Sequence, residues 1–134
     1  ASQASQISLA LKAVTLLDMA SARDLFANKL DAVQPEVRDE GCVRLKDARH
    51  PVLVLRGVKP VVSNDISLDH LQPALVISGP NAGGKTVALK TVGLATLLVQ
   101  HGCWVPSKEG SRVDLFRNVF SAIGDQQTVR VCVR

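Results

Sequence analysis

The sequence has few of the residues on which a disulfide framework, a zinc site or a base-stacking surface would depend. Its 134 residues include three Phe, one Trp and no Tyr, so a platform for stacking nucleic-acid bases is not expected. The three cysteines lie far apart without a C-x-x-C pair, which favours reduced thiols over a disulfide framework or a bound zinc ion.

Long apolar runs are also absent. No uninterrupted run reaches the length that a membrane span needs, and the first residues lack the basic start of a signal peptide. We therefore expect a cytoplasmic protein with no membrane partner. The net charge of +4 comes from scattered basic residues, which permits a nucleic-acid partner without indicating one.

The remaining composition is that of a folded domain. Apolar residues make up 46% of the chain, which is enough for a packed core and too much for a disordered protein. The length fits one small domain or part of a larger chain. The fold class is therefore to be sought in the order of the predicted helices and strands.

Residues 4–30 predict one long helix, because no Gly or Pro interrupts them and apolar side chains recur at helical spacing. That stripe consists of Ile7, Leu11, Val14 and Leu17. Other apolar residues lie off it, namely Leu9, Leu16 and Met19. A helix that is apolar on more than one side usually needs neighbours.

Residues 35–68 predict antiparallel strands and turns. Val43 and Leu45 alternate with polar residues, residues 52–55 are apolar and rich in valine, and the pair Asn64-Asp65 suits a turn. Residues 74–78, "ALVIS", predict a short strand buried in a sheet. Residues 85–101 predict a mostly buried helix that ends before a glycine.

Between this strand and this helix the sequence matches the phosphate-binding pattern G-x-x-x-x-G-K-[ST]. The candidate nucleotide-binding residues are Gly79, Pro80, Asn81, Ala82, Gly83, Gly84, Lys85, Thr86 and Val87. The glycines allow backbone N–H groups to surround a polyphosphate, and the helix start directs unpaired N–H groups at the anion.

Each polar side chain of the motif has a predicted contact. Lys85 would reach the β- and γ-phosphates of ATP, and the Thr86 hydroxyl would bind Mg²⁺. An ordinary glycine-rich turn is the alternative interpretation. The strand and helix predicted on either side favour nucleotide binding instead.

Hydrolysis needs an acidic residue at the end of a second apolar strand. The acids after the motif are Glu109, Asp114 and Asp125. Asp114 follows Val113, but a serine and an arginine come before, and Asp125 follows a glycine. None is predicted to end a buried strand, so we expect this chain to bind ATP–Mg²⁺ without turning it over, and no catalytic residue is assigned.

Five segments together resemble the ATPase domain of the MutS family, and most of all its type-two bacterial branch. They are "ARHPVL", "VVSNDISL", "GPNAGGKT", "LKTVGLATLLVQHGCWVP" and "FSAIGDQQTV", in the family's order. Mismatch-repair members usually have Ser-Thr-Tyr after the lysine, whereas residues 86–90, "TVALK", resemble the type-two pattern. The resemblance extends from about residue 14 to about residue 129.

The resemblance implies an α/β fold: a partial P-loop NTPase domain of the RecA/ABC-like kind, with a mixed β-sheet. Residues 1–34 would be the end of a lever helix. Residues 35–134 would be the N-terminal part of the ATPase domain, without its Walker B half. The ending "RVCVR" does not resemble the family, so we interpret the chain as part of a longer protein or as a disrupted reading frame.

The family's partners follow from the same resemblance. Its members form homodimers around two ATP molecules and grip DNA, and type-two members are linked with branched recombination intermediates and, in some bacteria, with collided ribosomes. They often carry an Smr nuclease domain, of which nothing is visible here.

Some positions keep two interpretations. Asn64 matches a family residue near the nucleotide, or it belongs to a turn. Val61 matches a position where mismatch-repair members stack an aromatic ring on adenine, and here it would pack the base with less specificity. Gln126 and Gln127 resemble a γ-phosphate sensor, or they lie in a solvated loop. His50 is expected to be structural rather than a catalytic base, because no neighbour in the sequence orients it.

Two other functions compete with this one. A P-loop ATPase of the ABC or SMC kind would more often read G-x-x-G-x-G-K-S-T, which residues 82–87 do not match. A non-enzymatic module for interaction or dimerisation would keep the fold but bind no nucleotide.

Overall fold

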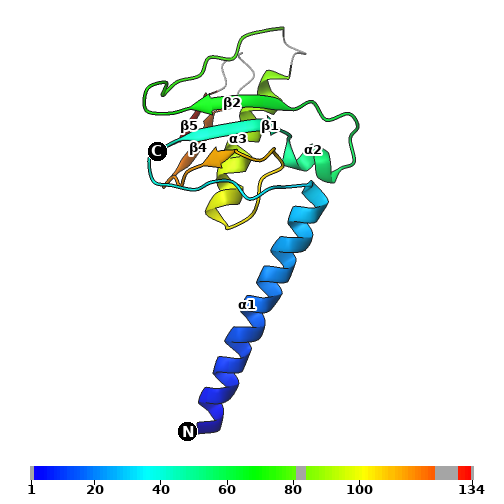
Figure 1. The fold of residues 1–134 in the computed structure, drawn as a ribbon, viewed down its shortest axis with the longest axis vertical. Coiled ribbons are helices and arrows are strands. Elements are labelled where there is room, and N and C mark those ends of the chain that lie inside the picture. The colour runs from blue at the N-terminus through cyan, green and yellow to red at the C-terminus, as the bar shows by residue number, and fades with distance from the viewer. Residues whose placement is uncertain (1, 81–83, 123–129, 134) are drawn as a thin grey trace.

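The computed structural model describes residues 2–80, 84–122 and 130–133. In it a long helix, α1 (Ser2–Leu30), projects from a small body built of two antiparallel sheets and a second long helix, α3 (Lys85–Gln100) (Figure 1). The α/β class is therefore confirmed, while the assignment to a partial P-loop fold stays a prediction.

Helix α1 confirms the helix predicted at the start of the chain. Only its last turns pack on the body, where Ala27 and Leu30 are buried. Its large apolar side chains from Ile7 to Leu25 remain 43–70% exposed, in keeping with the expectation that this helix needs neighbours. No helix in the described part of the chain is long and apolar enough to cross a membrane.

The end of α1 is tied to the body by Arg49. Its Nη2 donates hydrogen bonds to the carbonyl oxygen and the carboxylate of Asp31, at 2.8 and 3.0 Å. The same nitrogen lies 3.4 Å from the Leu30 carbonyl oxygen. Charge-assisted bonds of this kind satisfy carbonyls that the end of a helix leaves without intrahelical donors.

The larger sheet has the order β2-β1-β3, with β1 (Val43–Ala48) between β2 (Asn64–Leu68) and β3 (Arg112–Val113). Both pairings are antiparallel, and the register places Val43 opposite Leu68 on one side and opposite Val113 on the other. A second sheet pairs β4 (Val119–Ala122) with β5 (Arg130–Val133), also antiparallel. The predicted mixed sheet is therefore wrong for the described residues, whose only parallel pairing is a single bridge between Glu36 and Arg112.

One face of α3 closes the core against the larger sheet. Its buried residues are Ala88, Thr91, Val92, Ala95, Thr96 and Val99. They pack on the inward side chains of β1, whose alternation of buried and exposed residues is that of a strand with one solvated face. The two buried threonines donate to carbonyls four residues back, so their hydroxyls are satisfied inside the helix. The predicted helix is confirmed, and Gly102 after it has a φ of 69°.

Two predictions for residues 35–68 are wrong. Residues 52–55 lie in a short helix, α2 (Pro51–Leu55), because proline at a first helical position fixes a helical φ and the N–H groups of Leu53 and Val54 reach the His50 carbonyl. Asn64 and Asp65 lie in β2 instead of a turn, since pairing with β1 outweighs their local preference.

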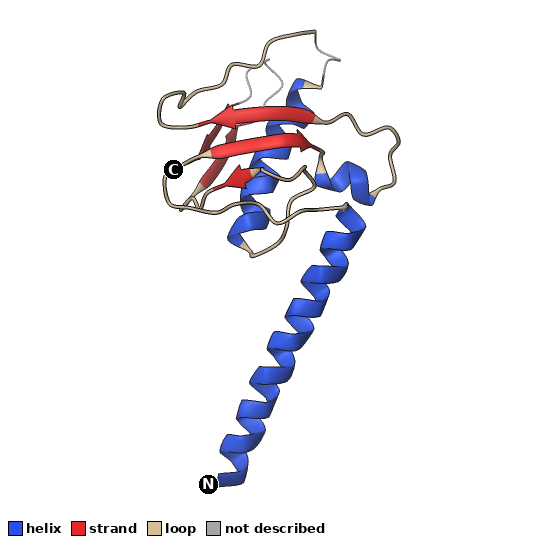
Figure 2. Cartoon of the chain, viewed as in Figure 1, coloured by secondary structure: helices blue, strands red, loops and turns tan. Residues whose placement is uncertain are grey.

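The strand predicted at residues 74–78 is also absent. Figure 2 shows the segment that leads towards α3 as loop, with Leu75 46% and Val76 89% exposed. An apolar run becomes a strand only where a neighbour supplies backbone hydrogen bonds. The described residues provide no such neighbour for this segment.

Candidate functional site

The phosphate-binding motif lies at the N-terminus of α3. Gly84 is the N-cap residue and has a left-handed backbone, with φ 78° and ψ 7°, and Gly79 has a φ of 146°. Both conformations favour glycine over residues with a side chain. The motif residues Asn81, Ala82 and Gly83 lie outside the described residues.

Lys85 closes back over the loop that precedes it. Its Nζ donates hydrogen bonds to the carbonyl oxygens of Gly79 and Pro80, the latter at 3.1 Å. The ammonium group therefore lies beside the first two residues of the motif. Phosphate oxygens, which carry a formal charge, are stronger acceptors for it than neutral carbonyls.

The first turn of α3 leaves donors available. The N–H of Ala88 makes the first intrahelical bond, to Gly84 at 2.9 Å, so the N–H groups of residues 85–87 have no acceptor within the helix. The N-cap side supplies no side-chain hydrogen bond either. Thr86 is exposed and Val87 half-buried, which leaves the Thr86 hydroxyl open to solvent and to a cation.

Asn64 and Val61 lie apart from this turn in the contacts that the structure describes. Asn64 starts β2 opposite Ala48, and Val61 is half-buried in the segment before β2. No hydrogen bond among the described residues joins Asn64 to the motif. Their predicted roles at the nucleotide stay predictions, and Gln126 and Gln127 lie outside the described residues.

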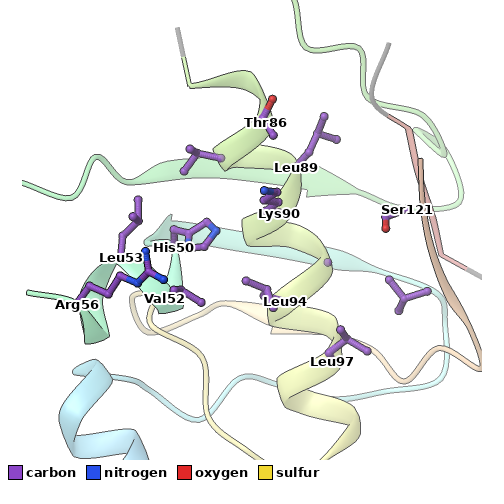
Figure 3. Close-up of a pocket in the computed structure, with 13 residues that line it drawn as sticks. His50, Val52, Leu53, Arg56, Thr86, Leu89, Lys90, Leu94, Leu97 and Ser121 are labelled. Atoms are coloured by element: carbon purple, nitrogen blue, oxygen red, sulfur yellow. The ribbon is translucent and has the colours of Figure 1, made fainter. Parts of the chain in front are cut away.

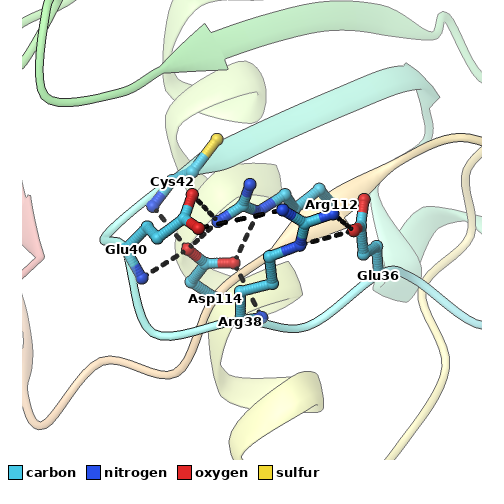
Figure 4. Close-up of polar contacts among 6 residues, drawn as sticks. All are labelled: Glu36, Arg38, Glu40, Cys42, Arg112 and Asp114. Carbon is cyan, nitrogen blue, oxygen red and sulfur yellow. Dashed lines mark hydrogen bonds and ion pairs between the residues drawn. The ribbon is translucent and has the colours of Figure 1, made fainter.

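Asp114 is a polar centre that the sequence did not reveal (Figure 4). It is fully buried, and its two oxygens accept backbone N–H bonds from Arg38, Glu40 and Cys42, each at 3.0 Å. Arg112 donates to both oxygens, with Nε at 2.8 Å from one and Nη2 at 2.7 Å from the other.

This arrangement fixes the charge of Asp114. Hydrogen bonding from Arg112 holds the pKa of Asp114 well below its usual range, and although burial opposes this, the three backbone N–H donors add to it. Hydrogen bonds to Asp114, and secondarily to Glu40, raise the pKa of Arg112 in turn. Asp114 is thus ionised at neutral pH, but its oxygens are already engaged by the protein.

The prediction that no acid ends a buried strand needs correction. Asp114 directly follows β3, whose Val113 is fully buried. The acceptor positions of its carboxylate are committed to Arg112 and to the segment 38–42. Among the described residues no group of three His, Cys, Asp or Glu side chains could hold a metal ion.

A groove of about 540 Å³ runs along the other face of α3, between α2 and β4 (Figure 3). Helix α3 contributes to it Thr86, Val87, Leu89, Lys90, Gly93, Leu94 and Leu97. The walls come from α2 with the preceding His50, and from Val119 and Ser121 of β4. No lining residue is acidic, and two, Arg56 and Lys90, are cationic.

His50 occupies the α2 side of this groove and is only 8% exposed. Burial lowers the pKa of His50, and the charge of Lys90 lowers it further, so the ring is neutral at pH 7. Its buried Nδ1 has no hydrogen-bond partner among the described residues. With no group to orient it, His50 has the environment of a structural residue rather than that of a general base.

Comparison with known proteins links the motif to one family. Residues 75–132 match the model described as MutS domain V. The chain is 46% identical over 113 residues to the endonuclease MutS2 of Geobacillus sp. (strain WCH70), a match that covers 84% of this chain and 14% of that protein. It is 44% identical over 124 residues to the putative endonuclease MutS2 of Bacillus subtilis (strain 168), covering 92% of this chain and 15% of that one.

A third relative, the endonuclease MutS2 of Pelotomaculum thermopropionicum, is 46% identical over 129 residues, with 96% of this chain and 16% of the relative covered. The chain thus spans 14–16% of the length of these three relatives.

Proposed function

Because this chain is a MutS2-like member of the MutS family, we propose that it forms the triphosphate-binding part of an ATPase domain. The observation that carries the proposal is the position of Lys85, whose ammonium lies over the carbonyls of Gly79 and Pro80 at the start of α3. A lysine, a glycine-rich loop and a helix N-terminus meet here, as polyphosphate binding requires.

The residues present fit ATP and Mg²⁺. The positive φ of Gly84 allows the backbone to curl towards the anion, and the N–H groups of residues 85–87 add donors without charge. Lys85 would turn from the loop carbonyls to the β- and γ-phosphates, and the Thr86 hydroxyl would bind Mg²⁺. The metal ion, when bound, neutralises charge on the phosphate oxygens.

Binding without turnover is the activity proposed for this chain. In-line attack needs a positioned water and an acid free to hold it through the metal. Asp114 is engaged in five hydrogen bonds, Glu109 lies exposed in a turn, and Asp125 is outside the described residues. The missing groups would come from other parts of a longer protein or from a partner subunit.

For the whole protein we propose a cytoplasmic, DNA-acting homodimer in which ATP controls a clamp, with branched DNA as the substrate class and ribosomes as a further partner. The family match disfavours the ABC and SMC alternatives. The non-enzymatic alternative makes a different prediction, because such a module would bind no nucleotide.

Titration of the purified chain with ATP, ADP and AMP by isothermal calorimetry, in the presence of Mg²⁺, tests the proposal. The variant Lys85→Ala should bind ATP much more weakly than the unmodified chain. Lys90→Ala, a lysine on the same helix five residues further on, serves as the matched control and should leave ATP affinity unchanged. Absence of ATP binding by the unmodified chain would overturn the proposal and favour the non-enzymatic module.

A further inference from the structure

Residues 37–41, in the connection between α1 and β1, form a short loop that buries little apolar surface. All five residues are exposed, and the one large apolar side chain among them, Val37, is 44% exposed. An open hollow of about 520 Å³ is lined by residues 37–39 and by residues 115–117, so the loop does not pack closely on the chain beside it. Segments with few buried contacts are the ones that open locally in folded proteins.

Backbone pairing fixes this loop at both ends. On one side the N–H of Glu36 donates to the Ser111 carbonyl at 2.9 Å, and the Glu36 carbonyl accepts from Val113 at 3.0 Å. On the other side the Cys42 carbonyl accepts from the N–H of Asp114 at 2.9 Å, and β1 begins at the next residue. Both attachment points therefore lie on β3 or next to it.

Between its ends the loop is held by one buried ion pair, Asp114 with Arg112 (Figure 4). The N–H groups of Arg38 and Glu40 each donate to the Asp114 carboxylate at 3.0 Å, and Arg112 contacts the Glu40 carboxylate at 2.8 Å. Among the described residues one backbone-to-backbone bond joins the loop to the chain beside it. It runs from the N–H of Leu115 to the Arg38 carbonyl and is long, at 3.4 Å.

Opening of this loop leaves no buried charge without a partner. Asp114 and Arg112 remain joined to each other by two hydrogen bonds, at 2.8 and 2.7 Å. Water takes the acceptor positions that Arg38 and Glu40 leave, whereas unfolding of the whole chain separates the ion pair and exposes the core as well. The polar contacts that close the loop can therefore be lost while the core stays packed.

We propose that residues 37–41 are a latch over the Asp114–Arg112 pair, and that this latch opens and closes as one unit. Its two ends, at Glu36 and Cys42, stay paired. Asp114 keeps the latch closed. The open state brings a buried ion pair into contact with solvent and leaves the larger sheet intact. This inference goes beyond nucleotide binding and does not depend on it.

Amide hydrogen exchange followed by NMR tests the proposal on the unmodified chain. After correction for intrinsic rates, the N–H groups of Arg38 and Glu40 should exchange at least about tenfold faster than that of Val113. Their rates should not change with urea below the unfolding transition. Val113, whose N–H bonds to Glu36 beside the latch, is the matched reference, and its exchange should accelerate as urea rises. Equal protection of the three amides would mean that the loop does not open separately from its ends, and would overturn the proposal.

The variant Asp114→Asn shows which group closes the latch. It keeps the shape of the side chain and removes its charge, so exchange at Arg38 and Glu40 should be about ten- to a hundredfold faster, the factor of one charge-assisted hydrogen bond. The control Asp31→Ala removes an exposed carboxylate from the other end of the same connection and should leave both rates unchanged. Unchanged rates in Asp114→Asn, or an equal acceleration in Asp31→Ala, would overturn the proposal. If Asp114→Asn does not fold, the exchange pattern of the unmodified chain still decides.

Discussion

Replacing Asp114 by alanine would remove the acceptor of five hydrogen bonds at once. Three of the donors are backbone N–H groups of Arg38, Glu40 and Cys42, and two belong to Arg112. The carboxylate thereby joins the end of β3 to a segment 72–76 residues earlier in the chain. No alanine atom can accept any of these bonds.

The size of the expected loss of stability follows from the charge of Arg112, which the substitution leaves buried. Breaking a buried ion pair by removing one partner costs about 3–5 kcal/mol, because the other charge is left uncompensated. Arg112 keeps a second partner, Glu40, at 2.8 Å and close to solvent, so the lower end of that range, about 3 kcal/mol, is expected. That is a large fraction of the roughly 5–15 kcal/mol by which native domains are stable.

Urea unfolding followed by circular dichroism measures the effect. With a slope of about 1.5 kcal/mol per molar urea, a loss of 3 kcal/mol lowers the midpoint by about 2 M. Asp114→Asn keeps the shape and one acceptor oxygen, so it should fall between alanine and the unmodified chain. The control is Asp31→Ala, whose side chain is 87% exposed and ion-paired with Arg49, with an expected cost within about 1 kcal/mol. Equal midpoints for Asp114→Ala and Asp31→Ala would refute the stabilising role of the cluster.

Four further outcomes are expected. The stability advantage of the unmodified chain over Asp114→Asn should be complete above about pH 5 and should shrink as the pH falls towards the lowered pKa of Asp114, by up to about 1.4 kcal/mol per pH unit; an advantage that is constant in acid would contradict the assignment. Gly84→Ala should destabilise the folded chain by about 1–2 kcal/mol, because an alanine would be strained at a φ of 78°. Gly93→Ala, inside α3, should stabilise the folded chain by about 0.5–1 kcal/mol. Melting temperatures that shift in the same direction in both variants would count against this. Lys85→Ala should weaken ATP binding roughly ten- to a hundredfold, the effect of one charge-assisted bond. The affinity for AMP, which lacks β- and γ-phosphates, should change little. Equal losses of affinity for both nucleotides would mean that Lys85 does not face the β- and γ-phosphates. Phosphate release by the chain should equal that of Lys85→Ala, and steady multiple turnover that vanishes in this variant would show that a second copy or another acid completes the site.

The parts predictable from sequence are those set by local signals. The helix at residues 85–100 is visible in its apolar periodicity, and the turn before it in the order of Gly84, Lys85 and Thr86. The long first helix is equally local, since nothing in residues 4–30 interrupts it. Each of these depends on neighbours within a few positions in the chain.

The parts that could not be predicted depend on distant partners. Asp65 lies in a strand because β1 lies beside it, and residues 74–78 form no strand because nothing among the described residues lies beside them. Asp114 looked unremarkable because its three backbone donors, in residues 38–42, are more than 70 positions away. The apolar and charged residues of a sequence show which groups need a partner, but the position of that partner is a property of the fold.

The attachment of α1 has a mechanical consequence. A helix of 29 residues is about 43 Å long, and its contacts with the body are concentrated at the Leu30 end. Arg49, which holds that end, directly precedes His50 and α2, and these line the same groove as the helix that starts at Lys85. A rotation of α2 by about 10° would therefore carry the far end of α1 through about 7 Å, since displacement grows with arm length.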